Sequence, residues 1–230
     1  MNSTWTVLGG WGISPDILRP VFGPQSTYID VNELAARICS NGLLAADWKL
    51  QLSDHLQPHL HDTRFLAGWS TGAILALGCA PLLSLDGLAL ISATPSFCRT
   101  GNYPFGIRSR MLHAMRAKLA TDTATVLDDF RQQCGLVSDL PTDIPWTPAA
   151  LQAGLDLLEF ITLDTVDTLP CEPLLIHGTR DTVIPVAAGN FLHQTLGGTM
   201  LHLDAPHACF TGNESAITTQ IETYLQRNTP

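Results

Sequence analysis

A serine between two glycines, in Gly68-Trp69-Ser70-Thr71-Gly72, constrains the fold of this chain more than any other stretch. The strand-like run Arg64–Ala67 comes directly before it, and the helix-like run Ala73–Leu77 follows it. Such a turn between a strand and a helix lifts the serine hydroxyl above the edge of a sheet, because the glycines leave room where the two backbones pass closely. We therefore predict that Ser70 is a nucleophile; the alternative is a glycine-rich turn whose serine only caps a helix.

The composition is that of a globular protein with a substantial core. The 230 residues fit one large domain, and 45% of them are hydrophobic while 14% are charged. No apolar run approaches the roughly 18 residues that a membrane span needs, and the N-terminus passes into Trp5–Leu8 without the features of a signal peptide. A net charge of −9 opposes non-specific binding to nucleic acid. We expect a cytoplasmic monomer that binds neither membranes nor nucleic acid.

Cysteine and histidine patterns give no indication of a metal or a cofactor. The six cysteines are widely spaced and form no Cys-x-x-Cys pair, so neither a zinc site nor a disulfide framework is predicted. His55, His59 and His61 lie close in sequence, but Pro58 breaks their helical spacing and no acidic or thiol partner is adjacent. Cys209 is interpreted as a buried structural thiol and not as a second nucleophile.

Short apolar segments alternate with helical ones along most of the chain. Strands are predicted at residues 4–8, Thr27–Val31, Arg64–Ala67, Leu85–Ser92, Pro173–Gly178 and Thr199–Leu203. Helices are predicted at Glu33–Ile38 with Asn32 as the cap, at about Ala45–Leu56, after Ser70, at Ala187–Leu196 and at Glu214–Gln226. This alternation favours an α/β fold with a mostly parallel sheet of about six strands and helices on both faces.

Residues 96–165 interrupt the alternation. The segment loses the strand pattern and becomes helical, and its first half is locally basic although the whole chain is acidic. We predict a helical insertion over 96–165, between two parts of a core formed by 1–95 and 166–230.

Two downstream residues complete a possible catalytic set with Ser70. A serine hydroxyl needs a base to accept its proton and a third group to orient that base. Asp181 and His207 each follow a predicted strand, and loops at the carboxyl ends of parallel strands gather at one edge of the sheet. We predict that Ser70, Asp181 and His207 form a triad in this order. The alternatives are a surface histidine, a turn-forming aspartate, and the substitute acids Asp164, Asp167 and Asp204.

Two backbone N–H groups are candidates for binding the oxyanion that forms during attack on an ester. Each such donor contributes roughly 3 to 4 kcal/mol of transition-state stabilisation. Thr71 N–H follows the nucleophile at the start of a helix, and Trp11 N–H lies in the glycine-rich turn Gly9-Gly10-Trp11-Gly12 after the first strand. The alternative for the second is a tight turn without a binding role.

Five motifs resemble those of the α/β-hydrolase family, and within it the esterases that act on pimeloyl-acyl-carrier protein methyl ester in biotin synthesis. Gly10-Trp11-Gly12 is similar to the family's oxyanion turn, and Gly68-Trp69-Ser70-Thr71-Gly72 to its nucleophile turn. The residues that flank the family's lid are similar to Ile91–Phe97 and Gly154–Leu158, and its histidine motif is similar to His207-Ala208-Cys209-Phe210. The resemblance covers most of the chain and implies the α/β-hydrolase fold with a helical lid.

The resemblance also implies a substrate site beneath that lid. The lid stretch that lies over the acyl chain is similar to Met115-Arg116-Ala117-Lys118-Leu119. The other implied substrate-binding residues are Trp11, Ser70, Thr71 and His207, although Thr71 stands where the family has an apolar residue. An apolar helix face with a basic rim suits an acyl chain on an acidic carrier protein; the alternative is an ordinary amphipathic helix with a solvated basic face.

These features favour a serine carboxylesterase that needs no cofactor. It would hydrolyse the methyl ester of pimeloyl-acyl-carrier protein to pimeloyl-acyl-carrier protein and methanol, through an acyl-enzyme. One alternative is a broad-specificity carboxylesterase or thioesterase for short acyl chains. The other is a binding protein with the hydrolase fold and no catalysis.

Overall fold

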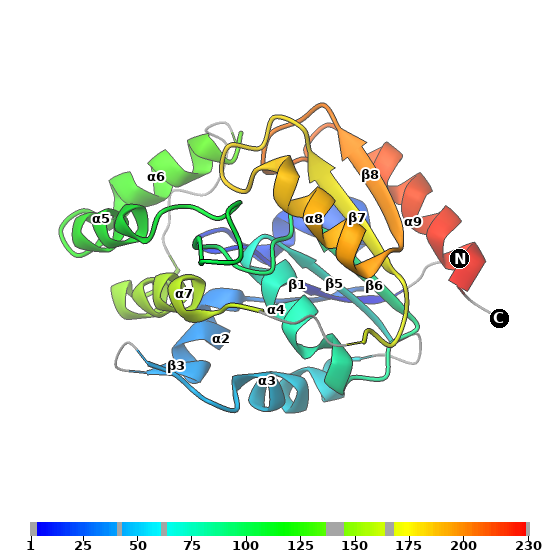
Figure 1. Ribbon diagram of the computed structural model, residues 1–230, viewed down its shortest axis with the longest axis horizontal. Coiled ribbons are helices and arrows are strands. Elements are labelled where there is room, and N and C mark those ends of the chain that lie inside the picture. Colours follow the sequence, from blue (N-terminus) through cyan, green and yellow to red (C-terminus); the bar gives the residue numbers. More distant parts are fainter. Residues whose placement is uncertain (1–3, 41–42, 61–63, 137–144, 164–167, 229–230) are drawn as a thin grey trace.

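A parallel sheet of six strands runs through the computed structural model, which describes residues 4–40, 43–60, 64–136, 145–163 and 168–228 (Figure 1). The strand order is β2-β1-β5-β6-β7-β8, and every neighbouring pair is parallel. The strands are Trp5–Leu8 (β1), Thr27–Ile29 (β2), Phe65–Trp69 (β5), Gly87–Ile91 (β6), Pro173–Gly178 (β7) and Thr199–Leu203 (β8). The predicted α/β fold with a parallel sheet of six strands is confirmed.

The central strands are apolar along their whole length because both of their faces are covered. All residues of β5, β6 and β7 are buried. A strand in this position has no polar face, which explains the continuous apolar run Leu88–Ile91. β8 lies at the edge of the sheet and is partly exposed.

Helices pack on the two faces of the sheet (Figure 1). α4 and α8 cover one face and α9 the other, while α1 packs against α9 and α3 against α4. These helices and α2 are Arg19–Phe22 (α1), Val31–Ile38 (α2), Trp48–Leu56 (α3), Thr71–Cys79 (α4), Val186–Leu196 (α8) and Glu214–Asn228 (α9). Short 3-10 helices lie at Pro15–Leu18, Gln57–His59 and Ala80–Leu82. In the described part of the chain, none of the helices has the length and apolar character that crossing a membrane requires.

The structure corrects two predicted helix starts. Asp30 caps α2, because its side chain accepts a hydrogen bond from Asn32 N–H. The predicted cap, Asn32, is instead fully buried, and its Oδ1 accepts a hydrogen bond from Gly12 N–H at 3.0 Å. α3 begins at Trp48 and not at Ala45. Both errors concern helix ends, where several polar residues compete for the cap.

A short hairpin between α2 and α3 was not predicted. Its strands, Cys39–Ser40 (β3) and Leu43–Leu44 (β4), pair antiparallel and form a separate sheet. Strands of two residues give no alternation of polar and apolar positions, so the sequence pattern does not indicate them.

Among the described residues between β6 and β7, three helices lie beyond the end of the sheet where the strands finish (Figure 1). They are Ser109–Leu119 (α5), Thr123–Gln133 (α6) and Pro148–Phe160 (α7). Asp122 caps α6 and Thr147 caps α7, each by a hydrogen bond to a backbone N–H. The first of these helices, α5, starts at Ser109 and not at residue 96. The stretch before it is irregular backbone with a bridge between Cys98 and Ile107.

The turn between β5 and α4 needs glycine on both sides of Ser70. A Cβ on Gly68 would overlap the Gly72 carbonyl group, and one on Gly72 would overlap the carbonyl oxygens of Leu8 and Gly9. These are backbone atoms of neighbouring elements and cannot move aside. The contact brings α4 against the end of β1, where Gly72 N–H donates a hydrogen bond to Gly9 O at 3.0 Å.

Replacing Gly72 with alanine is therefore expected to destabilise the fold. The added methyl group would push α4 away from β1, and overpacking of this kind costs about 1 to 3 kcal/mol. Gly101→Ala is the matched control, since a Cβ at that exposed position meets nothing within 4 Å. Urea unfolding should give a lower midpoint for Gly72→Ala alone; equal midpoints for the two variants would contradict the prediction.

Candidate active site

Ser70 lies at the junction of β5 and α4 in a conformation that few non-glycine residues adopt. Its backbone has φ 55° and ψ −117°, and the residue is 3% exposed. Ser70 N–H donates to Ile91 O at 3.0 Å, and Ser70 O accepts from the N–H groups of Ala73 and Ile74. These bonds hold the strained turn in place, and strain of this kind is typical of functional sites.

The predicted triad residues lie together in one hydrogen-bonded chain. His207 Nε2 is 2.9 Å from Ser70 Oγ, and His207 Nδ1 is 2.7 Å from Asp181 Oδ2. Asp181 comes from the loop after β7 and His207 from the loop after β8, so both approach Ser70 at the carboxyl edge of the sheet. All three side chains are buried. The geometry fits a serine whose proton can pass to an oriented imidazole.

Asp181 is held as a carboxylate by donors on both of its oxygens. Oδ1 accepts from Val183 N–H and Ile184 N–H, each at 2.8 Å. Burial alone would raise the pKa of the Asp181 carboxyl. The charge of His207 and hydrogen bonds from His177 and His207 outweigh that effect and leave the pKa of Asp181 below its usual value. The carboxylate is therefore charged when His207 accepts a proton.

Other acids and the nearby thiol do not replace these groups. Asp204 is 84% exposed and pairs with Arg180 at 2.7 Å, while Asp164 and Asp167 lie outside the described residues. Cys209 is fully buried, and burial raises the pKa of its thiol to about 12. A thiol with this pKa stays protonated near neutral pH and is not a nucleophile.

Three residues that the sequence analysis missed contact Asp181 or His207. His177 is buried beside Asp181, with Nε2 at 2.8 Å from Ile184 O and 3.3 Å from Asp181 Oδ2. Trp69 Nε1 and Ser92 Oγ donate to the His207 carbonyl oxygen at 3.2 and 2.8 Å. All three belong to strands or strand ends of the core, and their apolar neighbours in sequence gave no signal of these contacts.

The glycine-rich turn and the start of α4 present two free backbone donors. Neither Trp11 N–H nor Thr71 N–H has a hydrogen-bond partner among the described residues. The groups beside them are occupied, because Gly12 N–H bonds to Asn32 and Gly72 N–H bonds to Gly9 O. Unpaired backbone N–H groups are what an oxyanion hole requires, so both groups remain candidates for that role.

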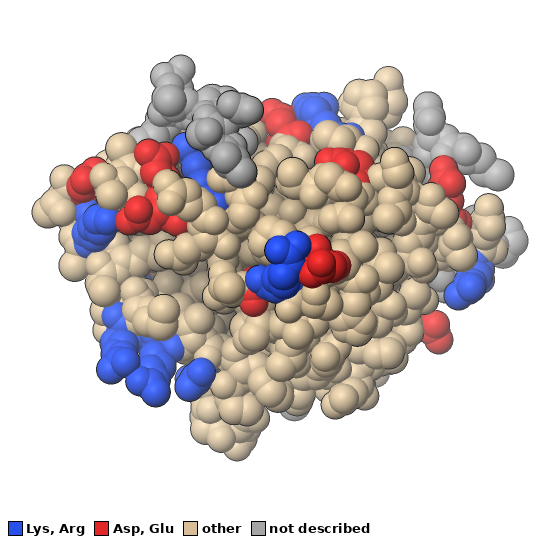
Figure 2. Space-filling view, turned by 90° about the horizontal axis from the view of Figure 1, so that it is seen from above, with Lys and Arg blue, Asp and Glu red and all other residues tan. Residues whose placement is uncertain are grey.

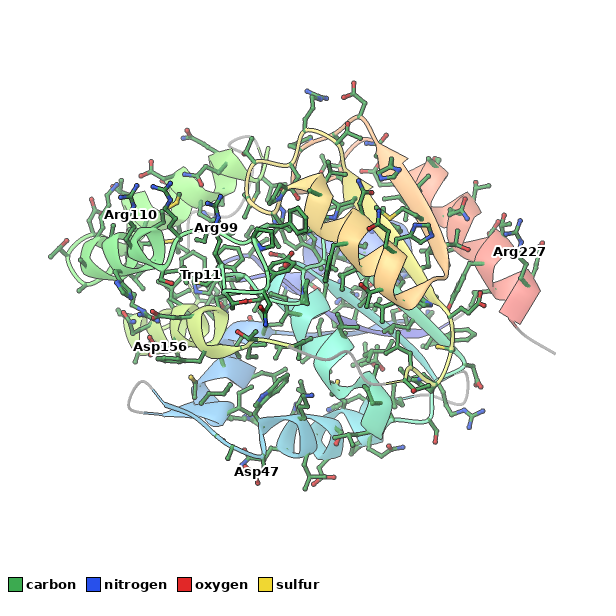
Figure 3. The ribbon with its side chains drawn as sticks, viewed as in Figure 1. Trp11, Asp47, Arg99, Arg110, Asp156 and Arg227 are labelled. Atoms are coloured by element: carbon green, nitrogen blue, oxygen red, sulfur yellow. The ribbon has the colours of Figure 1, made fainter. Side chains whose placement is uncertain are left out.

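Helices α6 and α7 pack directly on the Trp11 side chain (Figure 3). Trp11 Nε1 donates to Leu151 O at 2.8 Å, and the Phe130 ring meets the indole edge-on at 5.2 Å between centroids. A Cβ on Gly154 would overlap the same indole. Helices α6 and α7 thus pack on the turn that carries Trp11 N–H, one candidate oxyanion donor.

The predicted lid stretch on α5 divides into residues with different surroundings. Arg116 is paired with Asp156 at 2.8 Å and with Glu159, and Lys118 is paired with Asp129 at 2.7 Å. Met115 and Lys118 border a cavity, whereas Leu119 is buried and Ala117 is exposed. The charge of Arg116 is therefore satisfied within the helical segment.

That cavity lies between α5, α6 and the loop that carries Asp181. It has a volume of about 280 Å³ and a mainly apolar lining that includes Phe97, Ile107, Met111, Leu112, Met115, Val126, Phe130 and Val183. Ser70 and His207 do not line it, and both are almost completely buried.

A second, open hollow adjoins the cavity and is basic. Both share Ile107, Met111, Thr182 and Val183 in their linings, and the hollow adds Arg99, Arg108 and Arg110. Figure 2 shows Lys and Arg side chains gathered at the end of the molecule formed by α5, and Figure 3 places Arg99 and Arg110 on the same side of it. In the described ranges, none of these three arginines forms an ion pair with a carboxylate.

No three His, Cys, Asp or Glu side chains of the described residues lie together as a metal site would require. The rings of His55 and His59 are 5.5 Å apart between centroids, and His61 lies outside those residues.

Comparison with known proteins identifies the family. The model of the alpha/beta hydrolase family matches residues 13–211 of the chain. The chain belongs to the α/β-hydrolase family. The pimeloyl-[acyl-carrier protein] methyl ester esterase of Nitrosomonas europaea is 30% identical over 211 residues, which cover 83% of this chain and 82% of the relative. The protein of the same name from Pseudoalteromonas atlantica is 26% identical, with 89% and 86% covered.

Solved structures agree on the fold of this α/β hydrolase. The esterase EaEST from Exiguobacterium antarcticum has a TM-score of 0.79 at 17% identity, with 97% of this chain and 92% of the other covered. The type II thioesterase BorB has a TM-score of 0.61 at 19% identity, with 96% and 92% covered. The family and the esterase relative at 30% identity identify the chain as a carboxylic ester hydrolase.

Proposed function

We propose that this α/β hydrolase cleaves the methyl ester of pimeloyl-acyl-carrier protein, with Ser70, His207 and Asp181 as its catalytic triad. The 2.9 Å contact between Ser70 Oγ and His207 Nε2 supports the chemistry most directly. The substrate class is supported by the curated relatives, which carry this activity in their names. The products are pimeloyl-acyl-carrier protein and methanol.

The reaction proceeds through an acyl-enzyme in two similar halves. Ser70 Oγ attacks the ester carbonyl carbon while His207 Nε2 takes the hydroxyl proton, and Asp181 stabilises the imidazolium through Nδ1–H. The N–H groups of Trp11 and Thr71 bind the oxyanion. His207 then returns the proton to the departing methoxide oxygen. Water attacks the acyl-enzyme by the same route and releases the carboxylic acid.

In this proposal the segment of α5, α6 and α7 is a lid that covers an acyl chain. The apolar cavity of about 280 Å³ suits the methylene chain of a pimeloyl group. We expect this lid to open in each turnover, because only 3% of Ser70 is exposed in the structure. Lids of this kind exclude water and complete the site after the substrate has entered.

The carrier is proposed to dock on the arginines of the basic hollow. Arg116 and Lys118 are already paired with acidic side chains of the lid, so they have little charge to offer an acidic partner. Arg99, Arg108 and Arg110 have no such pairing in the described part of the chain, and their hollow leads into the apolar cavity. We therefore assign the docking contact to these three and leave Met115 as the lid residue that touches the acyl chain.

Reversing the charge of two of these arginines should weaken hydrolysis of the carrier-bound ester. For Arg108→Glu/Arg110→Glu we expect kcat/KM on pimeloyl-carrier methyl ester to fall by roughly 10-fold or more, because complementary charge speeds association. Free dimethyl pimelate and p-nitrophenyl butyrate have no carrier, so their rates should change much less. Rates on all three esters would be compared for each variant.

Arg227→Glu is the matched control, because this exposed arginine lies on α9 at the opposite end of the molecule (Figure 3). It should leave the carrier-bound rate near that of the wild type. Equal wild-type rates on the three esters would instead favour a broad carboxylesterase or thioesterase, and the carrier assignment would be wrong.

A further inference from the structure

The side-chain hydroxyl of Thr71 is buried without a hydrogen-bond partner. Thr71 is 1% exposed, and its Oγ1 is the only hydroxyl oxygen of the described residues that is fully buried and unpaired. The other buried hydroxyls around the site are bonded: Ser92 Oγ to His207 O, and Thr94 Oγ1 to Tyr103 and Ser96 O. A buried hydroxyl without a partner is unfavourable, and such a group in a folded protein calls for an explanation.

Covalent geometry places this hydroxyl close to the candidate oxyanion hole. Within any threonine, Oγ1 lies about 3 to 4 Å from the residue's own backbone nitrogen in every rotamer. Thr71 N–H is itself unpaired and follows the nucleophile at the first position of α4. Thr71 therefore carries two unpaired donors, and one oxygen atom bound at the N–H would have the hydroxyl in its neighbourhood.

A cap for α4 does not explain the hydroxyl. Thr71 is the first helical residue and Ser70 occupies the cap position, without a side-chain cap bond. The neighbouring N–H groups already have acceptors, since Gly72 N–H bonds to Gly9 O and those of Ala73 and Ile74 bond to Ser70 O. An apolar residue at this position, as in the related motif, would leave no unpaired hydroxyl.

We propose that Thr71 Oγ1–H is a third oxyanion donor, which binds the oxygen of the reacting ester carbonyl beside Trp11 N–H and Thr71 N–H. The hydroxyl keeps its proton and forms no covalent bond. Its hydrogen bond strengthens as negative charge moves to the carbonyl oxygen, so it acts on the transition state more than on the bound ester. The inference rests on ester hydrolysis at Ser70, but it does not require a carrier protein.

The test is the pair Thr71→Val and Thr71→Ser, assayed on p-nitrophenyl butyrate. Valine has nearly the shape of threonine without the hydroxyl, and serine keeps the hydroxyl. We expect Thr71→Val to lower kcat by about 10²-fold with KM little changed, while Thr71→Ser stays within a few-fold of the wild type. Affinity for an alkyl trifluoromethyl ketone, whose adduct with serine carries an oxyanion, should fall in Thr71→Val by a similar factor.

Thermal unfolding separates this role from a structural one. Thr71→Val removes an unpaired hydroxyl and should not lower Tm, whereas Thr94→Val removes a paired one and should. The proposal is overturned if Thr71→Val keeps the wild-type kcat, or if kcat falls without a matching loss of ketone affinity. If the wild type shows no preference for the carrier-bound ester, the proposed substrate is wrong, but the proposed role of Thr71 Oγ1–H is not affected.

Discussion

Replacing Ser70 with alanine should lower kcat on p-nitrophenyl butyrate and on pimeloyl-carrier methyl ester by roughly 10⁶-fold. The alanine cannot form the acyl-enzyme, and His207 Nε2 loses the hydroxyl that lies 2.9 Å away. Only the oxyanion donors and binding would remain, and they give a residual rate above that of water. The loss should appear in kcat with KM little changed, because Ser70 Oγ acts on the reacting carbon and not on the rest of the substrate.

A second serine supplies the matched control for this prediction. Ser53 is also buried, but it lies on α3 and its Oγ bonds to Leu50 O at 2.9 Å, away from the triad. Ser53→Ala should keep the wild-type rate, and a fluorophosphonate should label the wild type and this variant but not Ser70→Ala. Activity of Ser70→Ala above about 1% of the wild type, after removal of any wild-type contamination, would rule out Ser70 as the nucleophile.

The sheet and the order of the triad residues could be read from the sequence because each depends on a local pattern. Pro173–Gly178 and Thr199–Leu203 were predicted with their observed bounds, since each is a short and largely apolar run bounded by glycine or aspartate. The turn around Ser70 was predicted from the glycines at positions 68 and 72. The structure shows why glycine is needed there, since a Cβ at either position would overlap backbone atoms.

The surroundings of the site could not be read in the same way, because they depend on contacts between distant segments. Asn32 was interpreted as a helix cap, yet its side chain accepts a hydrogen bond from Gly12 N–H in the turn that carries Trp11. Arg116 was predicted to be part of the substrate-binding stretch of the lid, yet it is paired with acids of α7, 40 positions or more along the chain. A basic residue on an amphipathic helix looks the same in sequence whether solvent, a partner or its own chain pairs with it.

Asp181→Asn should lower kcat by about 10⁴-fold, because the asparagine would favour the tautomer of His207 that cannot accept the Ser70 proton. In the described part of the chain, each group that bonds to the Asp181 carboxylate is a nitrogen donor. Oδ1 accepts from Val183 N–H and Ile184 N–H, and Oδ2 faces His207 Nδ1 and His177 Nε2. An asparagine amide must turn its NH₂ group toward one of these sides.

The two sides differ in whether their hydrogen-bonding groups can change from donor to acceptor. The backbone N–H groups of Val183 and Ile184 remain donors, so the amide oxygen should stay with them and the NH₂ group should face His207. His207 would then accept at Nδ1 and carry its proton on Nε2, where it can no longer take the proton of Ser70. Substrate contacts are untouched, so KM should change little while kcat falls.

Asp204→Asn is the matched control, since its exposed carboxylate pairs only with Arg180 and lies on the loop that also carries His207. It should stay within about 2-fold of the wild-type kcat, as expected for an exposed ion pair. A loss of less than 10-fold in Asp181→Asn would mean that another group orients His207. A large loss in Asp204→Asn would identify that group, whereas a large loss in Asp181→Asn alone would establish that the four donors around Asp181 fix the protonation of the catalytic histidine.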